Sequence, residues 1–125
     1  MLKTILLIEK DENLREFFFR VFTIDGFEVL FLSSEDELPA LKKDDVNRVD
    51  VLVIDDCPDP QVFDEQLKQL FNDHGRTRKL PVLGVLSKGV MADPYHDYFD
   101  AVMIKDNFNI QLLTNLIEKF ATNQG

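Results

Sequence analysis

The sequence has little cysteine, a deficit of positive charge and no long apolar run. Among its 125 residues Cys57 is the single cysteine, so the chain can form neither an internal disulfide nor a metal site built from several thiolates. This cysteine content suits a reducing compartment. Lys and Arg number 14 against 23 Asp and Glu, which argues against binding nucleic acid or an anionic membrane. No apolar run approaches the roughly 20 residues of a membrane span, and the first residues turn acidic too early for a signal peptide. We therefore expect a cytoplasmic protein that does not enter a membrane.

The length and the apolar content predict one folded domain. Hydrophobic residues make up 45% of the chain and include 11 Phe, enough for a substantial core. We assign this domain to residues 1–121 and expect residues 122–125 to form a polar C-terminal tail.

Short apolar runs without polar alternation predict strands that are buried on both faces, as in a parallel sheet covered by helices. Five segments are predicted as strands: residues 5–8, 27–32, 51–54, 82–86 and 101–104. Apolar residues at helical spacing predict helices between them. The predicted helices are residues 12–25, 37–43, 62–72 and 108–120.

Two details of the helices follow from capping chemistry. Asp36 is a suitable N-cap for the second helix, because Pro39 then falls in the first turn, where its missing N–H is not needed. Between Ser87 and Phe99 the helical pattern fails at Gly89 and Pro94, so a fourth helix is shortened or missing.

Strand and helix alternate about five times, which predicts a doubly wound α/β fold with right-handed crossovers. In such folds ligands bind at the carboxyl ends of the strands. Polar residues gather there: Glu9 follows the first strand, Asp55 the third, Ser87 the fourth and Lys105 the fifth.

The order and spacing of these motifs resemble a response-regulator receiver domain of the CheY-like family. Residues 5–15 are similar to its opening strand, acidic cluster and first helix. Residues 50–55 resemble the strand with the phosphoacceptor aspartate, residues 80–83 the fourth strand, and residues 102–105 the fifth strand with its lysine. The resemblance spans residues 3–120 and implies a flavodoxin-like, five-stranded parallel sheet in the order 2-1-3-4-5.

The resemblance also implies roles for single residues. Asp55 would accept a phosphoryl group from a histidine kinase or a histidine phosphotransfer protein, Lys105 would pair with that group, and Ser87 is a candidate hydroxyl donor. Glu9, Asp11 and Asp55 would hold Mg²⁺. Such a domain is a signalling module and not an enzyme, apart from catalysing its own phosphotransfer and dephosphorylation.

Departures from the family pattern lie inside this site. Lys10 stands where the family has a direct Mg²⁺ ligand, and an ammonium about 4 Å from a dication repels it by something like 8 kcal/mol at an effective dielectric near 20. Mg²⁺ binding should therefore be weak. We also expect Lys10 or Lys105, or both, within salt-bridge reach of Asp55. Leu86 occupies the hydroxyl position and can donate nothing, while Ser87 comes one residue late.

Further departures concern the output side and the acceptor loop. Val102 replaces an aromatic switch residue, and Asp106 replaces a proline, so the Lys105–Asp106 bond should be trans. Asp56 is an alternative acceptor, because Pro60 would then have the family's usual offset, although the match to the strand would slip.

Two functions from different classes remain. The first is a two-component phosphorelay receiver that takes phosphate on Asp55, with impaired Mg²⁺-dependent chemistry. The second is a pseudo-receiver, a phosphorylation-independent module for binding a downstream protein or a second copy of itself. Lys10, Leu86 and Val102 favour the second, and Asp55 with Lys105 favours the first.

The first predicted helix offers a surface for a partner. We predict that Leu14, Phe17, Phe18 and Val21 face the core, which places Phe19 roughly 150° away, on the solvent side. Large exposed aromatics are enriched at the anchors of protein interfaces, so Phe19 is a candidate docking residue.

Overall fold

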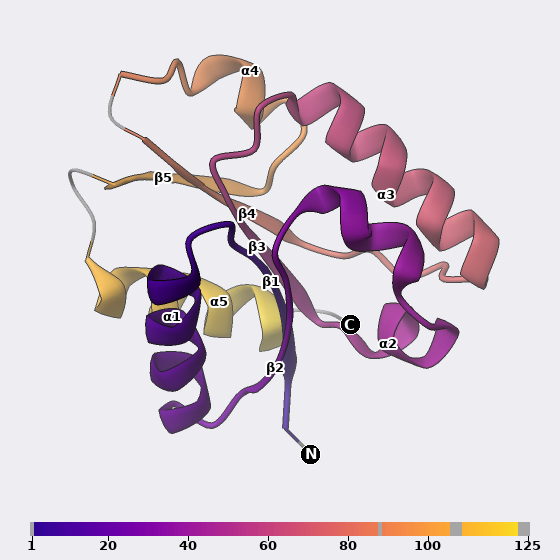
Figure 1. Ribbon diagram of the computed structural model, residues 1–125, viewed down its shortest axis with the longest axis horizontal. Coiled ribbons are helices and arrows are strands. Elements are labelled where there is room, and N and C mark those ends of the chain that lie inside the picture. Colours follow the sequence, from indigo (N-terminus) through magenta and orange to yellow (C-terminus); the bar gives the residue numbers. More distant parts are fainter. Residues whose placement is uncertain (1, 88, 106–108, 123–125) are drawn as a thin grey trace.

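A five-stranded parallel sheet in the order β2-β1-β3-β4-β5 lies at the centre of the computed structural model (Figure 1). The structure describes residues 2–87, 89–105 and 109–122. The strands are β1 (Thr4–Ile8), β2 (Glu28–Leu32), β3 (Val51–Asp55), β4 (Val82–Leu86) and β5 (Ala101–Ile104). The predicted flavodoxin-like fold class and its strand order are therefore confirmed.

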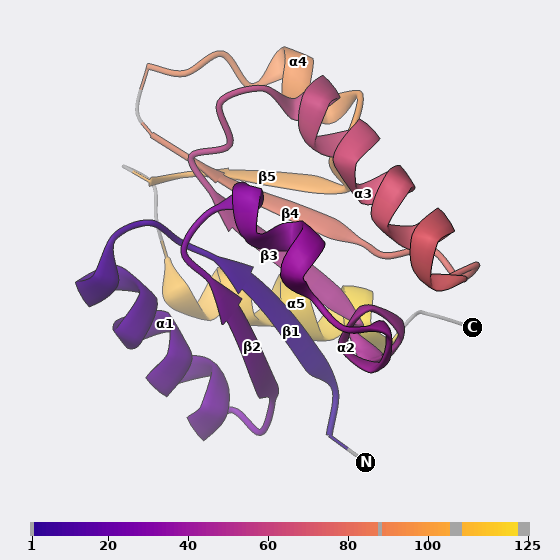
Figure 2. The ribbon, with the colours of Figure 1, turned by 45° about the vertical axis from the view of Figure 1, so that its right-hand side comes forward.

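Helices cover both faces of the sheet, which explains why its strands lack polar alternation (Figure 2). In β1, Ile5 and Leu7 enter one core with α1 (Glu12–Ile24) and α5 (Ile110–Thr122). Leu6 and Ile8 enter the opposite core. That second face is covered by the 3-10 helix η1 (Glu35–Ala40) and by α2 (Lys43–Arg48), α3 (Pro60–His74) and α4 (Asp93–His96).

The ends of α3 follow from local chemistry. Asp59 caps its first turn by accepting hydrogen bonds from the N–H groups of Gln61 and Val62, and Pro60 takes the first helical position. Gly75 ends the helix in the left-handed conformation, with φ 68°. The predicted span, 62–72, lies within this longer helix.

The second predicted helix is wrong in its boundaries and its type. Residues 35–40 form η1, capped by Ser34 instead of Asp36, and α2 begins only at Lys43. Pro39 lies inside η1. Since proline has no N–H to donate and disfavours the α conformation of the preceding residue, the segment takes tighter 3-10 turns and leaves the helix at Leu41.

The first helix also differs from its predicted core face. Phe18 and Phe22 are its buried residues, whereas the side of the helix with Phe17 is open and that residue is 46% exposed. The predicted core position of Phe17 is therefore wrong, and the face is rotated toward Phe22. Phe19 is 38% exposed, as expected.

The last two helices agree with the sequence prediction over the residues that the structure describes. The fourth helix is shortened to Asp93–His96, as predicted, and α5 runs from Ile110 to Thr122. The expected start of the last helix at 108, residue Asp106 and positions 123–125 of the expected tail lie outside the described residues. Among the helices of the described ranges, none has the length and apolar character needed to span a bilayer.

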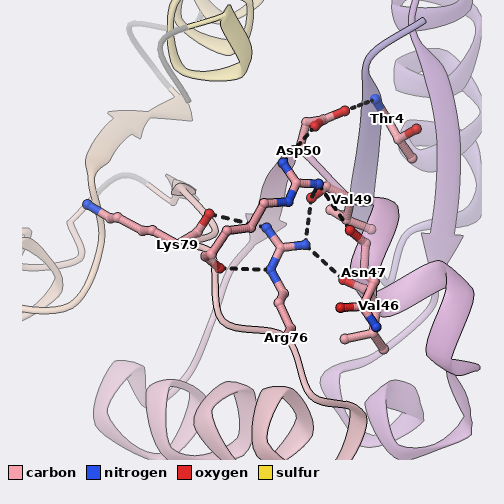
Figure 3. A network of polar contacts seen from close by, with 8 residues as sticks. Thr4, Val46, Asn47, Val49, Asp50, Arg76 and Lys79 are labelled. Atoms are coloured by element: carbon pink, nitrogen blue, oxygen red, sulfur yellow. Dashed lines mark hydrogen bonds and ion pairs between the residues drawn. The ribbon is translucent and has the colours of Figure 1, made fainter. Parts of the chain in front are cut away.

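Arg76 joins two loops at the amino ends of the central strands (Figure 3). It is 6% exposed, and its guanidinium donates to the carbonyl oxygens of Val46 and Val49 at 2.8 Å, of Arg78 at 3.1 Å and of Lys79 at 3.2 Å. This network connects the loops at the amino ends of the strands. The polar residues predicted for a functional site lie at the opposite, carboxyl ends.

Candidate functional site

The carboxyl ends of β1, β3, β4 and β5 bring together side chains that are far apart in the sequence. Asp55 is the last residue of β3, and Lys105 directly follows β5. The Nζ of Lys105 lies 2.7 Å from Oδ1 of Asp55, an ion pair in which the Asp55 side chain is 3% exposed. The expectation that an ammonium reaches Asp55 is confirmed through Lys105.

Glu9 is buried beside this ion pair. It is 3% exposed, and its Oε1 accepts a hydrogen bond from the N–H of Asp11 at 3.0 Å. Its Oε2 is buried and receives no donor from the described part of the chain. Asp55 is a neighbour that also offers only acceptor oxygens when ionised, so a hydrogen bond between the two carboxyl groups requires a proton.

Burial supplies the reason for that proton. It raises the pKa of Glu9 to about 8, with further contributions from the hydrogen bond to Asp55 and from the charge of Asp55. The Asp11 N–H and the charge of Lys105 act in the opposite direction. Near neutral pH the site therefore favours a neutral, protonated Glu9, and the Lys105 ammonium is the positive charge beside Asp55.

Asp56 turns its carboxylate toward the same ammonium. Its Oδ2 lies 2.8 Å from Nζ of Lys105, while its Oδ1 accepts hydrogen bonds from the Ser87 N–H at 3.0 Å and the Ser87 hydroxyl at 2.7 Å. Burial opposes the ionised form, but the contacts with Lys105 and Ser87 outweigh it and lower the pKa of Asp56. Burial likewise acts against the charge of Lys105, and Asp55 and Asp56 together outweigh it and raise the pKa of Lys105.

Ser87 reaches the site because β4 has already ended. Leu86 is the last residue of the strand and is 1% exposed in the core, so Ser87 lies beyond the alternation that would otherwise turn its side chain away. Its contact is with Asp56 and not with Asp55, which the sequence did not indicate.

Lys10 and Asp11 lie differently from their implied positions. The Nζ of Lys10 is 4.0 Å from Glu35, and its side chain is 56% exposed. The idea that Lys10 serves as a tethered cation for Asp55 is therefore wrong. Asp11 caps α1 by accepting a hydrogen bond from the N–H of Leu14 at 3.0 Å, so its carboxylate is engaged in starting that helix.

These positions do not fit a Mg²⁺ site of the kind the family resemblance implies. Mg²⁺ is usually held by carboxylate oxygens in near-octahedral geometry. Across residues 2–87, 89–105 and 109–122, no group of three or more His, Cys, Asp or Glu side chains is arranged to hold a metal ion. The Lys105 ammonium already contacts Asp55 at 2.7 Å, and a cation there opposes a second one.

A contact that the sequence reasoning missed holds the loop after Asp55. The hydroxyl of Tyr95, in α4, donates to the carbonyl oxygen of Cys57 at 2.5 Å. Cys57 is 2% exposed, and burial raises the pKa of its thiol to about 11, which disfavours the nucleophilic thiolate at neutral pH. The shortened fourth helix thus still serves the site by anchoring this loop.

Comparisons with known proteins rest on structure alone. No family model matches the chain, and no curated protein matches it. A response regulator receiver domain protein from Clostridium thermocellum has a TM-score of 0.77 at 20% identity, over 97% of this chain and 95% of its own. A CheY-like receiver domain from Methylobacillus flagellatus has a TM-score of 0.71 at 20% identity, over 96% and 99%.

A third neighbour carries a different description. It is a protein from Burkholderia pseudomallei with a proposed relation to pilus assembly, and it has a TM-score of 0.72 at 17% identity, over 99% of this chain and 92% of its own. At these identities the likeness is one of fold. Together with the strand order and the polar strand ends, it leads to one conclusion: the chain has the fold of response-regulator receiver domains.

Proposed function

We propose that the chain is a two-component receiver module in which Asp55 accepts a phosphoryl group, with chemistry impaired relative to the family. The observation that carries this proposal is the ion pair between Asp55, buried at the end of the central strand, and Lys105, at 2.7 Å. The pairing of a buried carboxylate with a lysine at the carboxyl edge of the sheet is what the family resemblance implies for the acceptor. The donor would be a histidine kinase or a histidine phosphotransfer protein, in the cytoplasm.

The transfer requires little covalent chemistry from the protein. A carboxylate oxygen of Asp55 attacks the phosphorus of a phosphohistidine, the P–N bond breaks, and the imidazole leaves with its electron pair and is protonated. The product is an acyl phosphate on Asp55. Lys105 would offset charge on the phosphoryl oxygens, since a loose transition state depends mainly on positioning and electrostatics.

Impairment follows from the groups around Asp55. Lys105 divides its charge between Asp55 and Asp56, and Ser87 is hydrogen-bonded to Asp56. The residues present do not fit Mg²⁺, so we expect only weak binding of that ion. An incoming phosphoryl group would therefore meet donors that are already engaged.

Intact-mass measurement after incubation with acetyl phosphate tests the proposal. We expect slow addition of one phosphoryl group, with a yield that changes little when Mg²⁺ is added or chelated. Asp55→Asn should abolish the addition, whereas Asp56→Asn should retain it. Addition that persists in Asp55→Asn would place the acceptor elsewhere, and rapid addition that depends on Mg²⁺ would contradict the impairment.

A second function is favoured by one observation: the donors of Ser87 and Lys105 bind Asp56, a carboxylate of the chain itself. The chain would then be a phosphorylation-independent pseudo-receiver that binds a downstream protein or itself. No labelling at all, combined with identical self-association of the native protein and Asp55→Asn in sedimentation, would support this function over the first.

A further inference from the structure

The Asp56 carboxylate is surrounded by three donors of different kinds. They are the Ser87 N–H at 3.0 Å, the Ser87 hydroxyl at 2.7 Å and the Lys105 ammonium at 2.8 Å. We call these three groups the anion cradle. The two Ser87 donors reach Oδ1 and the ammonium reaches Oδ2, so the three groups bind the two oxygens of one anion. Such a set also suits a tetrahedral oxyanion, because hydrogen bonds to a charged acceptor are the stronger ones.

The cradle lies directly beside Asp55. Lys105 belongs to both, since its Nζ is 2.7 Å from Asp55 and 2.8 Å from Asp56. Asp55 therefore shares its ammonium partner with a second anion, the carboxylate of the next residue.

The backbone of Asp56 indicates that this position is imposed on the chain. Its φ is 51°, the left-handed region, where residues other than glycine are uncommon. The N–H of Asp56 also donates to the carbonyl oxygen of Val85 at 2.9 Å, which fixes the peptide between β3 and β4. Such a conformation persists where surrounding contacts determine it, and here the cradle contacts supply that determination.

We propose that Asp56 is a resident anion that fills the cradle and excludes external oxyanions such as phosphate. This inference rests on the proposed function, because it assigns the cradle to the place beside the acceptor. It explains why donors suited to a phosphoryl group coexist with impaired chemistry: one carboxylate of the chain competes for them. Emptying the cradle should create a binding site for inorganic phosphate.

The test is a titration with inorganic phosphate followed by the ¹⁵N–¹H signal of Ser87, at constant ionic strength. In Asp56→Gly the carboxylate is removed and the left-handed backbone is relieved of strain. We expect a saturable shift of the Ser87 signal at millimolar phosphate, with an affinity at least about tenfold above the native protein, equivalent to about 1.4 kcal/mol. Adding Ser87→Ala to Asp56→Gly removes the hydroxyl donor and should weaken phosphate binding again. In this double variant, binding is followed by the other backbone signals that shift when phosphate is added to Asp56→Gly.

Two further variants separate this effect from its alternatives. Asp97→Asn removes one negative charge at the exposed end of α4 and should leave the phosphate response native. Asp56→Asn keeps a residue that tolerates the left-handed region and tests the charge alone, should Asp56→Gly fold poorly.

Equal phosphate binding by the native protein and by folded Asp56→Gly or Asp56→Asn would overturn the inference. A gain that Asp97→Asn reproduces would overturn it as well, since net charge would then be the cause. The readout is non-covalent binding, so it is independent of whether Asp55 becomes phosphorylated. If acetyl phosphate adds no phosphoryl group to Asp55, the proposed acceptor is refuted. A phosphate titration that shows binding to Asp56→Gly would still support the inference about Asp56.

Discussion

Glu9 links the protonation of the site to the stability of the fold. Its pKa is raised from 4.5 to about 8, chiefly by burial, so the folded chain binds a proton that the unfolded chain releases above pH 4.5. A raised pKa stabilises the fold fully below the unfolded value, and this contribution is lost as the pH rises through about 8. The stability should therefore fall between these two values.

The prediction is that Glu9→Gln removes this dependence. In urea denaturation from pH 5 to about pH 8, with a chelator present, native stability should fall relative to Glu9→Gln, by at most about 1.4 kcal/mol per pH unit. Glu16→Gln, on the exposed side of α1 beside Arg20, serves as control and should follow the native curve. Parallel curves for native protein and Glu9→Gln would show that Glu9 does not carry the proton.

Phe19 tests the surface of the first helix. It is 38% exposed and meets Phe31 edge to face, with ring centroids 5.9 Å apart. Phe19→Ala should change the free energy of unfolding by no more than about 1 kcal/mol, as most surface substitutions do. Phe18→Ala, at a residue that is 1% exposed, should cost about 3–5 kcal/mol.

The same pair of variants addresses docking. We expect Phe19→Ala to weaken binding to a partner or to a second copy, which sedimentation can measure. A loss of stability as large as that of Phe18→Ala would place Phe19 in the core and remove the reason to infer a docking surface.

At the scale of elements, β4 packs closely against the segment that joins α4 to β5, because Gly84 has no side chain. A Cβ on Gly84 would lie 2.5 Å from a ring carbon of Phe99, a residue that is 6% exposed. Gly84→Ala should therefore destabilise the fold by about 1–3 kcal/mol, measured by thermal and urea unfolding. Phe99→Leu introduced together with it should recover part of the loss, because the two sites share one space. Additive costs in the double variant would argue against the clash.

The strands were predictable because a strand that is buried on both faces appears in the sequence as a short apolar run without polar alternation. Each predicted strand matches an observed one within about one residue, and Asp55 and Lys105 follow from their places at strand ends. The alternation of chain elements was enough to bring them to one edge.

Other features depend on neighbours that sequence does not specify. Whether Lys10 or Lys105 reaches Asp55 depends on side-chain direction after each strand, and Lys10 instead lies near Glu35. The core face of α1 includes Phe22 in place of Phe17, since the helix is rotated to meet the sheet. The end of β4 at Leu86 agrees with the prediction, but the contact of Ser87 with Asp56 also depends on the left-handed backbone of Asp56, which the sequence pattern does not specify.

At the scale of the whole molecule, the Arg76 network and the candidate functional site lie at opposite ends of the strands. The Arg76 network joins the loops at the amino ends (Figure 3). Glu9, Asp55 and Lys105 meet at the carboxyl ends. Burial lowers the pKa of Arg76 to about 10, so it stays charged at neutral pH.

Arg76→Lys should accordingly cost about 3 kcal/mol or more, because several buried carbonyl oxygens lose their donors at once. Urea denaturation measures this loss. Arg48→Lys, in an exposed ion pair with Glu28, should cost no more than about 1 kcal/mol. Equal effects of the two substitutions would show that the Arg76 contacts do not hold the fold together.

The hydrogen bond between Tyr95 and the Cys57 carbonyl holds the loop after Asp55, and the Cys57 thiol can report when that loop opens. A buried thiol with a pKa of about 11 reacts with an alkylating reagent only after the segment around it unfolds locally, so its reaction rate measures how often that happens. Since Cys57 is the single cysteine, all thiol alkylation comes from this one residue. Tyr95→Phe removes the 2.5 Å bond to the Cys57 carbonyl and should hasten alkylation severalfold, while Phe19→Ala should leave the rate unchanged. Phosphorylation or partner binding could then be followed as a change in the rate at which this one sulfur becomes accessible.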